Sequence, residues 1–351
     1  MNRMSEAQDD NQTLEKKRGL NWRGVIQVCI GIGALALLIY KSDTHALLEA
    51  IKTTRISYLP FAVLMTILVN WLMAYRWGVI LNVRGQKIKT HRLFLYYLIG
   101  IFFTNFVPGG GISGDVARLI YADREVRDKP FVLSTLIYER LVALFVLLSL
   151  GFFATLASRN DLPEGRAFYL GEAVLAVAFL ASASLMSEFL SSRLAKLAQW
   201  IGRKVGLERL GLAVARTLEA ASELRKHKKM LLMTVLLSIL IRVAWGLGCF
   251  IVAQAMNLPV SFPILFSFIS LIDIVRMLPT WGGGIGVREW ALVALFANLG
   301  IAREQALMFS FLAFAPVMLN AFVGGIIYTS SAGILKKELQ GGTVPTKQVE
   351  V

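Results

Sequence analysis

Long apolar runs that carry almost no charge alternate along the chain with short stretches rich in lysine and arginine. A membrane-spanning helix needs about 20 mostly apolar residues, within a range of about 17–25. The pattern therefore predicts an all-α polytopic membrane protein, with a transmembrane domain at 22–335 between tails at 1–21 and 336–351. The predicted spans are 22–40, 59–82, 130–157, 167–187, 230–256 and 305–333.

The composition narrows the class of protein further. Hydrophobic residues make up 56% of the 351 residues and charged residues 17%, against about 45–50% and about 25% in soluble domains. This excludes a soluble globular enzyme, a disordered protein and a disulfide-stapled secreted module. The two cysteines lie inside apolar runs and the three histidines are scattered, so we expect no metal site, no redox site and no cofactor.

The net charge of +14 fits a membrane topology better than a nucleic-acid partner, because the basic residues sit in the loops between apolar runs. Cytoplasmic loops carry the excess of lysine and arginine. The 84–92 loop has four basic residues and no acid, and the 188–229 segment has ten basic residues against four acids. Both are predicted to be cytoplasmic, while the balanced 158–166 loop and the uncharged 257–262 loop are predicted to face outside. Both termini are then cytoplasmic, in a protein of the cell (inner) membrane.

The long basic segment at 188–229 alternates Leu, Ala and Val with Arg and Lys at helical spacing. This is typical of amphipathic helices that lie on an anionic leaflet. A solvated helical linker is the alternative interpretation of the same pattern.

Two further stretches, 93–117 and 263–303, are interrupted near the middle by Pro-x-x-Gly-Gly-Gly or Pro-Gly-Gly-Gly sequences that disfavour helix. With the loops oriented as above, the first stretch enters and leaves from the cytoplasmic face and the second from the opposite face. The sequence therefore predicts an inverted repeat with two re-entrant hairpins, about six full spans plus two hairpins. Paired Gly/Pro-interrupted segments in two halves point to a transporter's binding site, although plain loops between spans remain the simpler alternative.

Ionisable residues cluster beside these interruptions, where each one at the bilayer centre costs about 2.5–3.5 kcal/mol on insertion scales. Asp115 and Arg118 are three residues apart, as are Asp273 and Arg276, so each pair shares a helix face. Arginines beside glycine-exposed backbone N–H groups favour an anion site, in which the acids hold the arginines in place. Ion pairs that brace the two hairpins without any ligand are the alternative, and it is the favoured one for the charges inside the 130–157 run.

The candidate substrate-binding residues are Asn105, Gly109, Gly110, Gly111, Asp115, Arg118, Glu139, Arg140, Asp273, Arg276, Gly282, Gly283, Gly284, Arg288 and Glu289. Arg76, near the cytoplasmic end of its span, is expected to snorkel to the interface. Trp77, Trp245 and Trp281 are expected to pack or to lie at the interface rather than to form part of a site.

Several motifs resemble those of the lysylphosphatidylglycerol synthase/flippase membrane-domain family. They are Asn105-Phe-Val-Pro-Gly-Gly, Gly114-Asp115-x-x-Arg118, Glu139-Arg140-Leu141 and Pro279-x-x-Gly-Gly-Gly-Ile-Gly-Val-Arg288-Glu289. The resemblance implies two re-entrant segments around a central cavity through which lipids move between leaflets. It implies a translocation role for Asp115, Arg118, Glu139, Arg276, Arg288 and Glu289. Because the sequence ends at Val351, we do not expect the aminoacyltransferase domain that full-length synthases carry.

The expected function is therefore flipping or scrambling of a lipid with an anionic or phosphate-bearing headgroup, without enzyme activity. The expected partners are membrane lipids, namely an anionic phospholipid, an aminoacyl-lipid or a polyprenyl-phosphate glycolipid, with a lipid synthase as a possible further partner. The alternatives are a secondary transporter of a small organic anion, an intramembrane transferase with Asp115 or Glu139 as base, and a membrane anchor for a synthase. The sequence shows no Walker motif and no nucleophile–base pair.

Overall fold

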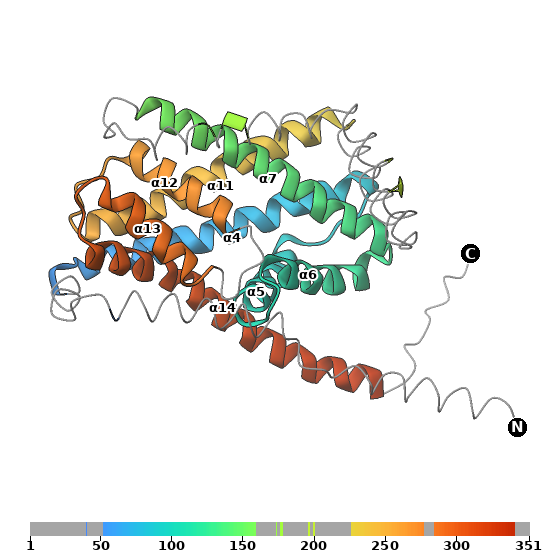
Figure 1. The fold of residues 1–351 in the computed structure, drawn as a ribbon. Coiled ribbons are helices and arrows are strands. Elements are labelled where there is room, and N and C mark those ends of the chain that lie inside the picture. The colour runs from blue at the N-terminus through green and yellow to red at the C-terminus, as the bar shows by residue number, and fades with distance from the viewer. Residues whose placement is uncertain are drawn as a thin grey trace, which may run out of the picture.

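The computed structural model describes residues 52–158, 226–276 and 284–340, together with Tyr40 and six isolated positions between 173 and 200. Within these ranges every regular element is a helix (Figure 1). The predicted spans 22–40 and 167–187 lie outside the described residues, as does the predicted amphipathic segment up to residue 225, apart from the isolated positions.

Four of the described helices are long and apolar enough to cross a membrane. They are α4 (Leu59–Leu81), α7 (Lys129–Ala157), α11 (Lys228–Ala255) and α14 (Arg303–Gln340). Single 3-10 turns, η1 (Ile56–Tyr58) and η2 (Asn82–Arg84), extend α4 at its two ends. These helices confirm the spans predicted at 59–82, 130–157, 230–256 and 305–333, and with them a helical membrane protein.

Local sequence accounts for where several of these helices begin. A proline lies in the first turn of α4 and of α7, where its fixed φ suits a helix and its missing N–H would have no partner within the helix. The Asp128 carboxylate accepts a hydrogen bond of 3.1 Å from the Phe131 N–H and so caps the start of α7.

Four shorter helices fill the two interrupted stretches. They are α5 (Thr90–Phe106), α6 (Gly111–Val126), α12 (Phe262–Val275) and α13 (Val287–Ala297). The first break contains Gly109 and Gly110 at φ of +111° and +56°, and Gly284 and Gly286 precede α13 at +93° and +86°. Such values favour glycine over any residue with a side chain, so the glycines form the turns that directly precede α6 and α13. At about 1.5 Å per residue, each of these helices is shorter than a bilayer core of about 30 Å.

The packing of the helices repeats between the two parts of the chain. Helices α4 and α11 pack against each other along the middle, with α5 and α6 to one side and α12 and α13 to the other (Figure 1). Helix α5 packs on α14 in the way that α12 packs on α7, and α6 packs on α7 as α13 packs on α14. Exchanging α4–α7 with α11–α14 therefore leaves this pattern of neighbours unchanged.

Contacts at the helix ends show at which end of the bundle the chain enters and leaves each part. Arg84 after α4 forms an ion pair of 3.2 Å with Asp128 before α7, so the chain leaves and returns at the same end of the bundle. In the other part, Leu258 after α11 and Ile301 before α14 belong to one hydrophobic cluster.

Glycines let α5 lie unusually close to its two neighbours. A Cβ on Gly114 of α6 would lie 2.6 Å from the Gly100 carbonyl oxygen of α5, and a Cβ on Gly324 of α14 would overlap the Leu98 carbonyl. Close backbone approach of this kind is how small residues mediate helix packing in membranes. This close approach lets α6, which carries Asp115 and Arg118, lie inside the bundle beside α7.

Candidate functional site: two buried charge clusters

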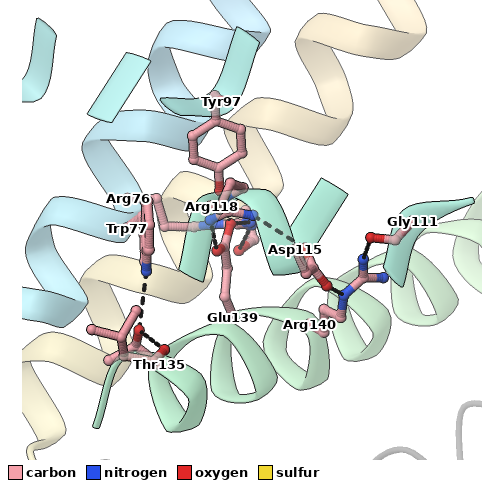
Figure 2. A network of polar contacts seen from close by, with 11 residues as sticks. Arg76, Trp77, Tyr97, Gly111, Asp115, Arg118, Thr135, Glu139 and Arg140 are labelled. Carbon is pink, nitrogen blue, oxygen red and sulfur yellow. Dashed lines mark hydrogen bonds and ion pairs between the residues drawn. The ribbon is translucent and has the colours of Figure 1, made fainter. Parts of the chain in front are cut away.

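The first cluster forms around the carboxylate of Glu139, in the middle of α7. Arg76 Nη2 of α4 and Arg118 Nη2 of α6 each lie 2.6 Å from one of its two oxygens, and the Tyr97 hydroxyl of α5 donates to it as well. Figure 2 shows these side chains converging from four helices. The exposed fractions of Arg76, Arg118 and Glu139 are 3%, 8% and 4%, so both charged groups of each ion pair are buried inside the protein.

Aromatic rings and hydroxyl groups complete the surroundings of these arginines. The Arg118 guanidinium carbon lies 4.3 Å from the Trp77 ring centre and 3.7 Å from that of Tyr97, both within cation–π range. Arg76 Nη1 donates to Ser238 Oγ of α11 at 2.7 Å. The cluster therefore connects α11 with α4, α5, α6 and α7.

The edge of the first cluster is more open. Asp115 pairs with Arg140 and lies 3.6 Å from Arg118 Nη1. Arg140 also donates to the Gly111 carbonyl at 3.0 Å, and half of its side chain is exposed. Arg140 thus holds the start of α6 through a backbone carbonyl, as Figure 2 shows.

The second cluster lies where α11, α12, α13 and α14 meet. Asp273 pairs with Arg242 and with Arg276, the latter at 3.0 Å. Arg288 pairs with Glu289, and Ser310 Oγ lies 3.0 Å from Arg288 Nε and 2.9 Å from a Glu289 oxygen. The second Glu289 oxygen accepts the Gly286 N–H at 2.6 Å, so a carboxylate of α13 itself occupies the start of this helix.

A pocket of about 360 Å³, including its open mouth, lies against this second cluster. Its walls combine three charged residues with mostly apolar ones. The lining residues are Trp245, Cys249, Ile269, Ile272, Asp273, Arg276, Arg288, Leu292, Phe309, Ser310, Ala313 and Phe314. Arg288 Nη1 and Trp245 Nε1 are buried and have no hydrogen-bond partner among the described residues. Both residues line the pocket, so two N–H donors without a partner belong to side chains of its wall.

The structure thus gathers most of the predicted site residues into two clusters. Gly111, Asp115, Arg118, Glu139 and Arg140 meet in the first, and Asp273, Arg276, Arg288 and Glu289 in the second. The other predicted residues take different places. Asn105 donates to the Ile101 carbonyl of its own helix at 2.8 Å, Gly109 and Gly110 form the turn before α6, and Gly284 is buried before α13. Gly282 and Gly283 lie outside the described residues.

One expectation from the sequence was wrong, and several contributing residues were missed. Arg76 does not snorkel: it is buried and pairs with Glu139 and Ser238, because α7 and α11 pack against that side of α4. Tyr97, Ser310 and Phe314 were also missed, since aromatic and hydroxyl residues inside apolar runs carry no signal that separates packing from a site.

These features define the class: a helical membrane protein that buries arginine–carboxylate clusters beside two interrupted helix pairs. The chain belongs to the family described as lysylphosphatidylglycerol synthase TM region, whose family model matches residues 24–319.

Similar proteins come from archaea and carry names without an activity. A UPF0104 membrane protein of Pyrococcus horikoshii is 22% identical over 333 residues, covering 88% of this chain and 95% of the relative. One of Methanothermobacter thermautotrophicus is 22% identical over 316 residues, covering 80% and 87%. One of Methanocaldococcus jannaschii is 26% identical over 125 residues, covering 34% and 37%. No solved structure matches the chain.

Proposed function

We propose that this protein translocates a lipid with an anionic or phosphate-bearing headgroup between the leaflets of the cell membrane. The observation that carries the proposal is the charge of the two clusters. The first contains Arg76, Arg118 and Arg140 against Asp115 and Glu139, a net charge of +1. The second contains Arg242, Arg276 and Arg288 against Asp273 and Glu289, again a net charge of +1.

A net positive charge inside a membrane protein calls for a counter-charge. Purely structural clusters are expected to pair their charges, because each uncompensated charge at membrane depth costs several kcal/mol. A phosphate group that enters the bundle would supply that counter-charge, while the acyl chains of the lipid stay in the bilayer. The apolar residues that line most of the pocket beside the arginines suit such a ligand.

The packing of the helices supports an inverted repeat with two re-entrant hairpins. The neighbour pattern is unchanged when α4–α7 and α11–α14 are exchanged, and the ends of α4 and α7 meet through Arg84 and Asp128. With the basic loops in the cytoplasm, the first hairpin would open to the cytoplasm and the second to the outside. A headgroup could then be passed between two sites of the same charge from opposite faces.

The family suggests which lipid is carried, without making this chain a synthase. The matched model describes the membrane region of a synthase of lysylphosphatidylglycerol, so an anionic phospholipid or its aminoacyl derivative is the first cargo to test. We propose no chemistry for the chain itself.

A secondary transporter of a small organic anion is the second candidate. The pocket beside Arg276 and Arg288 favours it, because a small anion could be held there without any acyl chain. It predicts uptake of a soluble anion into liposomes without any lipid movement.

The test is exchange of headgroup-labelled lipid between leaflets of proteoliposomes that contain the purified protein. Arg118→Ala and Arg288→Ala should each slow exchange at least tenfold, since each removes a charged contact worth more than about 1.4 kcal/mol. Arg92→Ala is the matched control, because the Arg92 side chain is more than half exposed in its ion pair with Glu125, and it should exchange at the wild-type rate. Wild-type exchange by both cluster variants, with monodisperse protein throughout, would refute the proposal.

A further inference from the structure

We infer that Trp245 and Arg288 together bind one singly charged oxyanion, such as the phosphodiester of a lipid headgroup, in the pocket between α11, α12, α13 and α14. This inference rests on the proposed function and deepens it. It assigns a ligand contact to a tryptophan for which the sequence predicted only packing, and it limits the charge of the ligand.

Arg288 is held so that one of its nitrogens is left for a ligand. Its Nε donates to Glu289 at 2.9 Å and to Ser310 at 3.0 Å, and its Nη2 pairs with Glu289. The Phe314 ring centre lies 3.8 Å from the guanidinium carbon and fixes the plane of the group. Nη1 is buried without a partner among the described residues, and Arg288 lines the pocket.

Trp245 supplies a second donor to the same pocket. Its Nε1 is buried and, in the part of the chain that the structure describes, finds no acceptor. Trp77 in the other cluster shows the ordinary arrangement, since its Nε1 donates to Thr135 Oγ1 at 3.0 Å. A buried indole N–H normally has a partner, and leaving one unpaired costs about 1–3 kcal/mol. An oxyanion held by Arg288 would satisfy both donors with its two oxygens.

The charge of the second cluster limits the ligand to one negative charge. Three arginines against two acids leave +1, and the remaining lining is largely apolar. A phosphodiester carries one charge and would make the site neutral. A phosphomonoester carries a second charge above its second pKa of about 6, and that charge would have no counterpart in a medium where charges are costly.

The first cluster also contains buried nitrogens without a partner among the described residues, Arg76 Nε and Arg118 Nε, but its own side chains surround them. Both oxygens of Glu139 are paired with arginines, and the Arg118 guanidinium contacts two aromatic rings. In the conformation described here, the oxyanion therefore binds in the second cluster, while the first cluster braces α4, α6, α7 and α11.

The experiment measures lipid binding apart from translocation. Purified wild-type protein in a zwitterionic nanodisc is titrated at pH 8 with fluorescent short-chain phosphatidylglycerol, a phosphodiester, and with phosphatidic acid, a phosphomonoester. Dimethyl phosphate, a soluble phosphodiester with one negative charge, serves as the soluble competitor. Trp245→Phe removes the N–H and keeps an aromatic ring; Trp71→Phe, on an exposed part of α4, is the matched control.

We expect Trp245→Phe to weaken phosphatidylglycerol binding about tenfold, the effect of one hydrogen bond to a charged group, and Trp71→Phe to leave it unchanged. Arg288→Ala should abolish it, and wild type should prefer phosphatidylglycerol to phosphatidic acid.

Unchanged affinity in Trp245→Phe, or equal binding of both lipids, would overturn the inference while leaving lipid translocation intact. Wild-type lipid exchange by Arg118→Ala and Arg288→Ala is the separate result that would refute the proposed function. Displacement by dimethyl phosphate, with weak lipid binding, would show that the oxyanion is soluble and would assign the pocket to the organic-anion transporter.

Discussion

Glu139 shows how strongly a single residue can depend on its neighbours inside a membrane protein. Its carboxylate compensates Arg76 and Arg118, and all three side chains are buried. Removing one partner of a buried ion pair leaves an uncompensated charge, which costs far more than the pair contributes by itself.

Glu139→Gln should therefore destabilise the protein by about 3–5 kcal/mol, because two buried arginines lose their carboxylate at once. Thermal unfolding of the detergent-solubilised protein measures this loss. Arg92→Gln breaks the pair with Glu125, in which the arginine side chain is more than half exposed, and should cost no more than about 1 kcal/mol. Equal effects of the two substitutions would mean that solvent or lipid headgroups reach Glu139 in the membrane.

Sequence neighbours in these clusters often separate in space. Glu139 and Arg140 are adjacent, yet Glu139 turns inward to Arg76 and Arg118 while Arg140 lies half exposed against Asp115. Successive residues of a helix point about 100° apart, so adjacency predicts different partners. A spacing of three residues is a better guide to contact, because it places two side chains on the same face of a helix. Asp273 and Arg276 form the expected ion pair at 3.0 Å.

At the scale of the elements, the sequence predicts what depends on local chemistry. Apolar runs of spanning length predict the long helices close to where the structure has them. The proline and glycine run of the first break predicts the end of α5 and the start of α6 in the same way. The partners of Arg76 and Arg242 could not be predicted, because they depend on how α4 and α11 pack against helices distant in sequence. The unused donor of Trp245 is likewise visible only once the pocket is assembled.

The contact between α5 and α14 is an element-scale feature that one methyl group should disrupt. A Cβ on Gly324 would overlap the Leu98 carbonyl, a backbone atom that cannot turn away. Gly324→Ala should therefore push the helices apart and cost about 3 kcal/mol or more. The measurement is the midpoint of thermal unfolding in detergent.

Gly78→Ala is the matched control, because the added Cβ would meet only the end of the Leu93 side chain at 3.1 Å. Replacement of a helical glycine by alanine gains about 0.5–1 kcal/mol, so a nearly neutral effect is expected there. If Gly324→Ala were as stable as Gly78→Ala, α14 would not approach α5 as closely as the structure has it.

At the scale of the whole molecule, the two halves share a packing pattern but use it differently. The first half arranges its cluster around Glu139, and the second has a pocket lined by two residues, Trp245 and Arg288, that each carry a buried N–H without a partner among the described residues. In a protein that opens its binding site alternately to the two faces of the membrane, the two halves would take the open and the closed arrangement in turn. The described conformation would then be one of two, the one in which the site of the second half is open.

The inverted repeat itself makes a prediction about which side of the membrane each helix end faces. If both hairpins are re-entrant, the residues before α5 and after α6 lie in the cytoplasm, and those before α12 and after α13 lie outside. Cysteines placed in a cysteine-free background at Lys89, Lys129, Ser261 and Asn298, all exposed, report this through a membrane-impermeant maleimide. In right-side-out vesicles Ser261→Cys and Asn298→Cys should label, while Lys89→Cys and Lys129→Cys should label only after the vesicles are opened. If Lys89 and Lys129 labelled from opposite sides, the first hairpin would cross the membrane, and the two clusters could not serve opposite faces as proposed.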